Sequence, residues 1–298
     1  MSTSLRALEG IRIVSLALNL PGPAALMRCR RMGAHCVKVE PPSRDPMGLY
    51  NPGAYAEMHE GVKVVQADLK TDAGQKQLHH ELETADVLLT SFRPSALEKL
   101  GLGWRALHQR YPVLSQVAIV GAPGVRAEEP GHDLTYLADN GLVPGLELPA
   151  TLYADMSGSL MASEAVLQAA LRRRAPYAGT GEPHPQGVYI EVALSEAAGY
   201  LALPRRWGLT LPAGSVGGAH AGYALYPCKD GRVAVAALEP HFAAALCDAA
   251  GVEGENGIRK MFARTTHDAV RAFFASKTCS ELDRLAVERD LPLHTMPA

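Results

Sequence analysis

The sequence predicts an α/β protein in which a doubly wound parallel sheet forms the larger part and a smaller α+β domain follows. Short apolar runs alternate with segments of helical periodicity across residues 11–203, and glycine or proline stands at most junctions. Strands that alternate with helices favour a parallel sheet, because each return to the sheet requires a crossover. The length of 298 residues, with 47% hydrophobic side chains, supplies a core for one large domain or two unequal ones.

The first predicted elements are a strand, a loop, a helix and a second strand. "IRIVSLAL" (11–18) is the strand, and "NLPGP" follows as a loop that we expect to be irregular because its two prolines flank a glycine. The spacing of apolar residues predicts a helix over 24–34 that stops at Gly33, and "HCVKVEPP" (35–42) is the next strand. This length suits a right-handed crossover.

The same alternation continues to residue 203. Further strands are predicted at 62–69, 86–92, 113–121 and 188–194. Further helices are predicted at 71–85 with Thr71 as N-cap, at 94–102, 103–112 and 156–174, and at 195–203, where Pro204 stops the helix. "AGTGEPHPQG" (178–187) is predicted to be a loop.

A second region follows a segment rich in glycine and alanine, "LTLPAGSVGGAHAG" (209–222). A strand pair is predicted at 223–238, turned at Lys229-Asp230-Gly231, with helices after it. We therefore expect a large domain at 1–205, a linker at 206–222 and a small domain at 223–298.

Composition narrows the class of protein. The chain has 29 basic and 31 acidic side chains and no long basic run, so we expect no nucleic-acid surface. Its five cysteines are odd in number and lack CxxC spacing, which favours reduced thiols in the cytoplasm. The N-terminus reads as a strand and not as a signal peptide, and no apolar run approaches the roughly 20 residues that span a membrane. No HExxH, CxxC or clustered His/Asp spacing predicts a metal site.

Ligands of doubly wound sheets lie at the carboxyl ends of the strands. The first of these loops has neither GxGxxG nor GxxxxGK[ST] spacing, so a nicotinamide or nucleoside triphosphate site is not supported. Lys38, Arg44 and Arg93 fall at or just beyond predicted strand ends. Each alone reads as a solvated surface charge, and three at one edge favour an anionic ligand.

For three further residues the sequence allows an ordinary structural role as well as a catalytic one. His132, in "EPGHDLTYLADNG", reads locally as a loop histidine, because a general base needs a partner and a pocket. Asp155, in "ADMSGS", reads as the N-cap of the helix that follows, a place that also suits a rigidly held carboxylate. Glu239, in "ALEPHF", reads as a strand-end turn.

The order of motifs resembles a known family. The segments "LEGIRIVSLALNLPGPAALMRCRRMGAHCVKVEPPSRD", "ADVLLTSFRPSALEKLGLG", "PGHDLTYLADNG", "YADMSGSLMASEAVLQAALRRR" and "YPCKDGRVAVAALEPHF" occur in the sequence and spacing of the family III CoA-transferases of the CaiB/BaiF type. The resemblance runs from about residue 8 to the C-terminus. "GHD" and "ALEPHF" resemble the α-methylacyl-CoA racemase branch.

The resemblance implies roles for these residues. In the racemases a histidine and an aspartate are the two bases at the substrate α-carbon, which matches His132 and Asp155, and a nearby glutamate matches Glu239. In the transferases the residue at the position of Asp155 is instead a nucleophile that forms acyl-enzyme intermediates. Coenzyme A runs along the large domain in this family, which implies Lys38, Arg44, Arg93 and Asp133 as its binding residues.

The resemblance also implies an assembly. Family members have a Rossmann-like large domain and form interlocked homodimers, so Glu239 would come from the opposite chain. They usually return to the large domain after the small one, and we expect this return segment to be missing because the sequence ends at "LPLHTMPA".

The favoured function is an acyl-CoA racemase or epimerase that acts on a 2-methyl-branched thioester, with no metal, no redox cofactor and coenzyme A only as part of the substrate. A CoA-transferase that uses Asp155 and a CoA-thioester-binding homologue without turnover are the alternatives. His132 discriminates between the first two.

Overall fold

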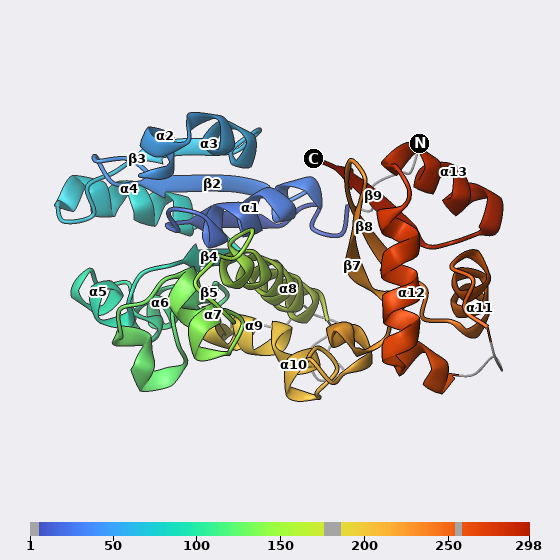
Figure 1. Cartoon of the computed structure of the whole chain (residues 1–298). Helices are drawn as coiled ribbons and strands as arrows, with labels where there is room; N and C mark the ends of the chain where they lie inside the picture. The colour runs from blue at the N-terminus through green and yellow to red at the C-terminus, as the bar shows by residue number, and fades with distance from the viewer. Residues whose placement is uncertain (1–5, 176–185, 254–257) are drawn as a thin grey trace. The chain divides into compact units, whose positions relative to one another are not determined.

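The computed structural model describes residues 6–175, 186–253 and 258–298. The chain forms two compact units, the first ending at Ala202 and the second spanning Leu203–Ala298 (Figure 1).

The first unit is built on six parallel strands in the order β3-β2-β1-β4-β5-β6, as predicted for a doubly wound sheet. Its strands are β1 (Arg12–Ser15), β2 (His35–Glu40), β3 (Lys63–Gln66), β4 (Val87–Thr90), β5 (Ser115–Val120) and β6 (Tyr189–Ala193). The order reverses between β1 and β4, and the crevice at such a reversal is where open α/β sheets bind ligands.

Helices lie between successive strands along the chain, and the last helix follows β6. They are α1 (Pro21–Arg31), α2 (Met47–Tyr50), α3 (Pro52–Met58), α4 (Asp72–Leu82), α5 (Pro94–Lys99), α6 (Trp104–Arg110), α7 (Asp133–Asp139), α8 (Tyr153–Arg174) and α9 (Leu194–Leu201), with a 3₁₀ turn at Gly124–Glu128. Thr71 is the N-cap of α4 as predicted, and its Oγ1 accepts a hydrogen bond from the Gly74 N–H at 3.1 Å.

Both faces of the sheet are covered (Figure 1). Apolar side chains of α1 and α8 pack with Ile13 and Leu89 on one face. Apolar side chains of α4, α5 and α6 pack with Val14 and Leu88 on the other. Successive residues of a strand point to opposite faces, so burial on both sides explains why the inner strands β1, β4 and β5 read as apolar runs.

Two predicted boundaries near prolines are wrong. Helix α1 begins at Pro21, inside the segment expected to be irregular. Pro204, expected to stop the helix predicted at 195–203, lies inside the short helix α10 (Leu203–Arg206), and α9 has already ended at Leu201. In both helices the proline occupies the first turn, where its missing N–H has no intrahelical partner to lose. The short helices α2 and α3 were not predicted. Most of the predicted loop 178–187 lies outside the described residues.

The second unit contains an antiparallel sheet in the order β7-β8-β9. Its elements are β7 (Tyr223–Cys228), β8 (Gly231–Ala236), α11 (Pro240–Ala249), α12 (Arg264–Ala275), α13 (Cys279–Arg289) and β9 (Leu293–Pro297), with turns at Ser215–Ala219 and Ile258–Phe262. The strand pair turned at Lys229 and Asp230 is confirmed, whereas β9 is an addition to the helices expected after it. Tyr226 and Phe274 stack at 5.3 Å between ring centroids in its core.

Within the described ranges, every helix is too short or too polar to cross a bilayer.

Candidate active site

A cavity of about 740 Å³ opens at the carboxyl ends of β1, β4 and β5 in the first unit. Leu18 and Asn19 follow β1, Ser91 and Phe92 follow β4, and the starts of α7 and α8 complete the wall. This is the crevice at which the strand order reverses, and it is the edge where the sequence predicts a ligand. His132, Asp133, Asp155 and Arg93 all line it.

Asp155 is the third residue of α8 and is partly exposed to the cavity. The pKa of its carboxyl is raised from the ordinary 3.8 to about 6, first by burial and then by the charge of Asp133, while His132 acts in the opposite direction. A carboxyl with this pKa exchanges protons close to neutral pH, as a general acid or base requires.

The predicted capping role of Asp155 is wrong because α8 begins at Tyr153, with Leu152 at the N-cap position. Asp155 therefore lies within the first turn and donates instead of accepting: its backbone N–H binds Oδ1 of Asp133 at 2.9 Å. Asp133, 5% exposed, thus supplies the cap from another helix. Its carboxylate binds the backbone of α8, which is a positioning role. The CoA-binding role expected of Asp133 stays a prediction.

His132 precedes α7 and is exposed. Thr135 fixes its backbone at both ends, because Thr135 Oγ1 accepts from the His132 N–H at 3.0 Å and donates to the His132 carbonyl at 2.7 Å. The charge of His132 lowers the pKa of the Asp155 carboxyl, so the imidazole lies within electrostatic reach of Asp155. The sequence around His132 predicted a loop histidine and did not reveal that Asp155 is close enough to interact with it.

Two tyrosines that line the cavity, Tyr50 and Tyr136, were not predicted as site residues from the sequence. The charge of Asp155 contributes to a raised pKa at both Tyr136 and Tyr50, after burial in each case. Tyr136 follows His132 by four residues, so helical spacing was the available signal. A Cβ at Gly121 would lie 2.3 Å from the Tyr136 hydroxyl oxygen, and one at Gly131 would lie 2.6 Å from it, so both glycines make room for the ring. Tyr50 has no sequence signal.

The predicted anion-binding cations separate in the structure. Arg93 precedes α5, is exposed, and lines the cavity. Arg44 is exposed with φ of 64° on the loop after β2 and does not contribute to the described wall of the cavity.

Lys38 does not fit the expected phosphate contact. Its side chain is fully buried, and the ammonium pairs with Asp45, with Glu40 Oε1 at 3.1 Å, and with Nε2 of His59 at 2.8 Å. Two carboxylates already balance its charge, so it is a support of the site and not a ligand. Asp45 extends this support, because its carboxylate also accepts the Asn19 N–H at 3.1 Å, at the rim of the cavity.

Glu239 belongs to the second unit, where it occupies the N-cap position of α11. Its carbonyl accepts the Ala243 N–H at 2.9 Å, and its side chain makes no capping bond.

Comparison with characterised proteins gives two kinds of relative. The chain is 31% identical to the probable fatty acyl-CoA transferase of Mycobacterium tuberculosis over 58% of its length, and spans about half, 48%, of that protein. It is 30% identical to the mouse α-methylacyl-CoA racemase over 92% of its length and 73% of the racemase. The (R)-2-hydroxy-4-methylpentanoate CoA-transferase of Clostridioides difficile is 27% identical over 76% of this chain and 61% of the transferase.

Solved structures agree on the fold. A crystal structure of a hypothetical protein from M. tuberculosis superposes with a TM-score of 0.82 and 25% identity, covering 96% of this chain and 83% of the other. A CaiB/BaiF family protein from Brucella suis gives a TM-score of 0.77 at 22% identity, over 98% and 84% of the two chains, and supports the fold alone. The model of CoA-transferase family III matches residues 8–296, nearly the whole chain, and this protein therefore belongs to CoA-transferase family III.

Proposed function

We propose that this protein is an acyl-CoA racemase or epimerase that inverts the α-carbon of a 2-methyl-branched acyl-CoA by 1,1-proton transfer. The observation that carries the proposal is the pairing of His132 with Asp155 in one cavity, where the pKa of Asp155 stands at about 6. The racemase similarity, which extends over 92% of the chain, points the same way.

Inversion needs two groups with complementary protonation. One base removes the α-proton from one face of the thioester, an enolate forms, and the conjugate acid of the second base returns a proton to the opposite face. A carboxyl with a pKa of about 6 holds and releases a proton at comparable cost near neutral pH, so Asp155 suits both directions. The partial positive charge at the N-terminus of the 22-residue helix α8, where Asp155 lies, favours the negative charge of the enolate.

Binding of coenzyme A remains a proposal for two of the four residues first considered. Arg93 offers an exposed guanidinium at the cavity, and Arg44 offers one on the loop after β2. Guanidinium groups suit phosphates because their donors match paired oxygens. We further propose a homodimer in which a second copy of the chain supplies Glu239. No cofactor beyond the coenzyme A of the substrate enters the proposed reaction.

A CoA-transferase reaction is the second candidate, and a specific observation favours it. Relatives that carry transferase names are as similar in identity as the racemases. The partly exposed Asp155 carboxylate is also placed to attack a thioester carbonyl.

The two reactions separate in D₂O. The pure R and S forms of a 2-methylacyl-CoA are incubated separately with the protein, and α-deuterium and configuration are followed by NMR and chiral analysis. We expect wild type to exchange and invert both forms. Asp155→Asn and His132→Gln should each abolish inversion. Each variant keeps one base, so each should retain α-exchange with only one of the two forms, and the form that exchanges should differ between the two variants. His80→Gln, at an exposed position of α4, is the matched control and should behave as wild type.

Other outcomes contradict the proposal. Absence of α-exchange in wild type excludes the racemase reaction, and unchanged exchange of both forms in His132→Gln refutes the two-base assignment. Transfer of CoA to a free carboxylic acid, with a hydroxylamine-sensitive adduct at Asp155, would establish the transferase instead. Binding of the thioester without either activity would refute both reactions.

A further inference from the structure

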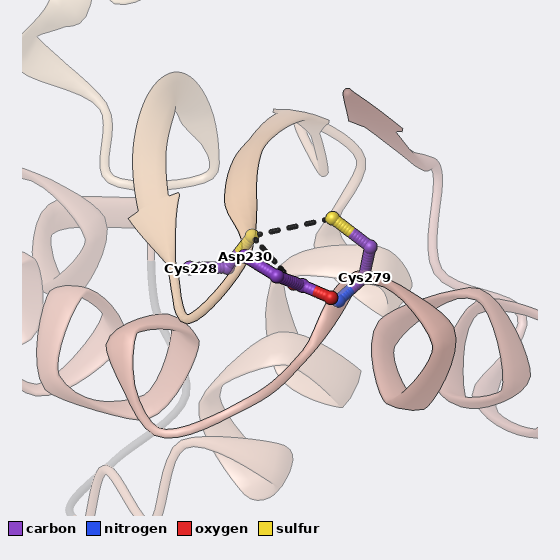
Figure 2. A group of neighbouring side chains, drawn as sticks. All are labelled: Cys228, Asp230 and Cys279. Carbon is purple, nitrogen blue, oxygen red and sulfur yellow. Dashed lines mark hydrogen bonds between the residues drawn. The ribbon is translucent and has the colours of Figure 1, made fainter. Parts of the chain in front are cut away.

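The second unit brings together three side chains whose donor atoms suit a metal ion (Figure 2). Cys228 ends β7, Asp230 lies in the turn between β7 and β8, and Cys279 is the first residue of α13. One donor atom from each lies within 4.8 Å of the others. Cys228 and Cys279 are 51 positions apart, so no local spacing revealed the group.

The distances fit a tetrahedral ion better than a disulfide. The two Sγ atoms are 3.5 Å apart, and Cys228 Sγ is 3.9 Å from Asp230 Oδ1. Two sulfurs bound to one tetrahedral zinc ion lie about 3.8 Å apart, and a sulfur and an oxygen about 3.5 Å apart, whereas a disulfide needs about 2.05 Å. Both thiols are free.

Backbone contacts hold the three segments in place. The Cys279 N–H donates to Asp230 Oδ1 at 2.7 Å, so the carboxylate is oriented by the start of α13. The Lys229 N–H donates to the Lys277 carbonyl at 2.8 Å, which joins the turn to the segment before that helix. Thr278 and Glu281 then cap α13 reciprocally, with bonds of 3.3 and 2.8 Å. Placement of the ligands therefore does not depend on the metal.

The chemistry of the donors selects the kind of cation. Two sulfurs favour a thiophilic ion over calcium or magnesium, which prefer oxygen. Cys279 is buried while Asp230 is exposed, so water has access to a fourth position.

We propose that Cys228, Asp230 and Cys279 bind one thiophilic divalent cation of the Zn²⁺ class, with water as the fourth ligand. On binding, each thiol releases one proton to solvent and its sulfur forms a bond to the ion, while the carboxylate binds as it stands. The ion would join the β7–β8 turn to α13, and its role is structural. This inference goes beyond the proposed function and concerns the second unit alone.

Cobalt(II) is the first probe, because thiolate ligation gives it a sulfur-to-metal charge-transfer band and tetrahedral geometry gives it strong visible absorption. The full chain is stripped with a chelator, kept reduced, and titrated with Co²⁺ and then Zn²⁺. We expect one equivalent of cobalt, both spectral features, displacement by zinc, and a higher unfolding temperature with zinc.

Variants test each ligand. Cys228→Ser and Cys279→Ser should each weaken zinc binding by more than the ~10–100-fold that loss of an outer partner causes. Asp230→Asn keeps an oxygen for the Cys279 N–H, so it should fold normally, retain the charge-transfer band and bind more weakly. Cys247→Ser, at a buried cysteine of the same unit that lies 3.5 Å from Met261 Sδ, is the control and should bind as wild type.

Three results would overturn the inference. The first is the absence of the charge-transfer band in reduced wild type, and the second is its survival in the Cys228→Ser/Cys279→Ser double variant. The third is formation of a Cys228–Cys279 disulfide, detected by mass, at the same rate with and without zinc. None of these readouts requires turnover, so they stand apart from the test of the racemase.

Discussion

Asp155 should destabilise the folded first unit at neutral pH, because its carboxylate is ionised in a place that disfavours charge. Its pKa is raised from 3.8 to about 6, mainly by burial. Between these values the folded state binds a proton that the unfolded state has lost, so stability falls as pH rises through this window. The difference corresponds to about 3 kcal/mol once the pH is above both values.

Replacement of Asp155 by asparagine removes this cost. We expect Asp155→Asn to stabilise the first unit by up to about 3 kcal/mol near pH 8, by roughly half of that near pH 5, and by little below pH 4. The same change should abolish inversion of the substrate, so the variant gains stability and loses activity.

Urea unfolding measures the effect. The chain has two tryptophans, Trp104 in the first unit and Trp207 in the second. In a Trp207→Phe background, fluorescence of Trp104 reports on the first unit. Glu164→Gln is the control, because Glu164 is exposed on the same helix and a surface change should stay within about 0.5 kcal/mol. Equal stability of wild type and Asp155→Asn near pH 8, or a gain that does not depend on pH, would refute the reasoning.

Three further changes test the support of the site. Asp133→Asn keeps an acceptor for the Asp155 N–H but removes a charge that raises the Asp155 pKa, so the acidic limb of the pH–rate profile should move to lower pH, and a shift to higher pH contradicts this. Lys38→Met leaves buried carboxylates unpaired and should cost about 3–5 kcal/mol in urea unfolding, with a loss below 1 kcal/mol as the contrary result. Gly121→Ala forces a methyl group against Tyr136 and should cost about 1–3 kcal/mol, whereas unchanged stability would show that the ring moves freely.

The sheet was predictable from the sequence because its signal is local. The inner strands β1, β4 and β5 are buried on both faces, so each appears as an apolar run without any knowledge of its neighbours. Strand β9 was missed for the opposite reason. It is short and ends in proline, and its partner β8 lies more than fifty residues earlier, so only the packed unit reveals the pairing.

The site was predictable only through the order of family motifs. Local patterns predicted a loop residue at His132 and an N-cap at Asp155. Neither segment alone predicts that α7 packs beside α8, and this packing brings the two residues together. The phosphate contact predicted for Lys38 was wrong for a related reason. A lysine near a strand end is usually solvated, and the Asp45 and His59 that bury it come from loops that return to the strand.

The order of strands has a consequence for synthesis on the ribosome. Strands β1 to β5 all come from the first 120 residues, whereas β6, the last partner, begins at Tyr189. Every residue of β5 is buried in the finished sheet, so the nascent chain carries an open apolar edge until nearly seventy more residues have been made. Unpaired edges of this kind recruit other chains. Pairing of β6 with β5 is therefore the step that protects the emerging first unit from aggregation. Chains truncated before β6 should accumulate as insoluble material.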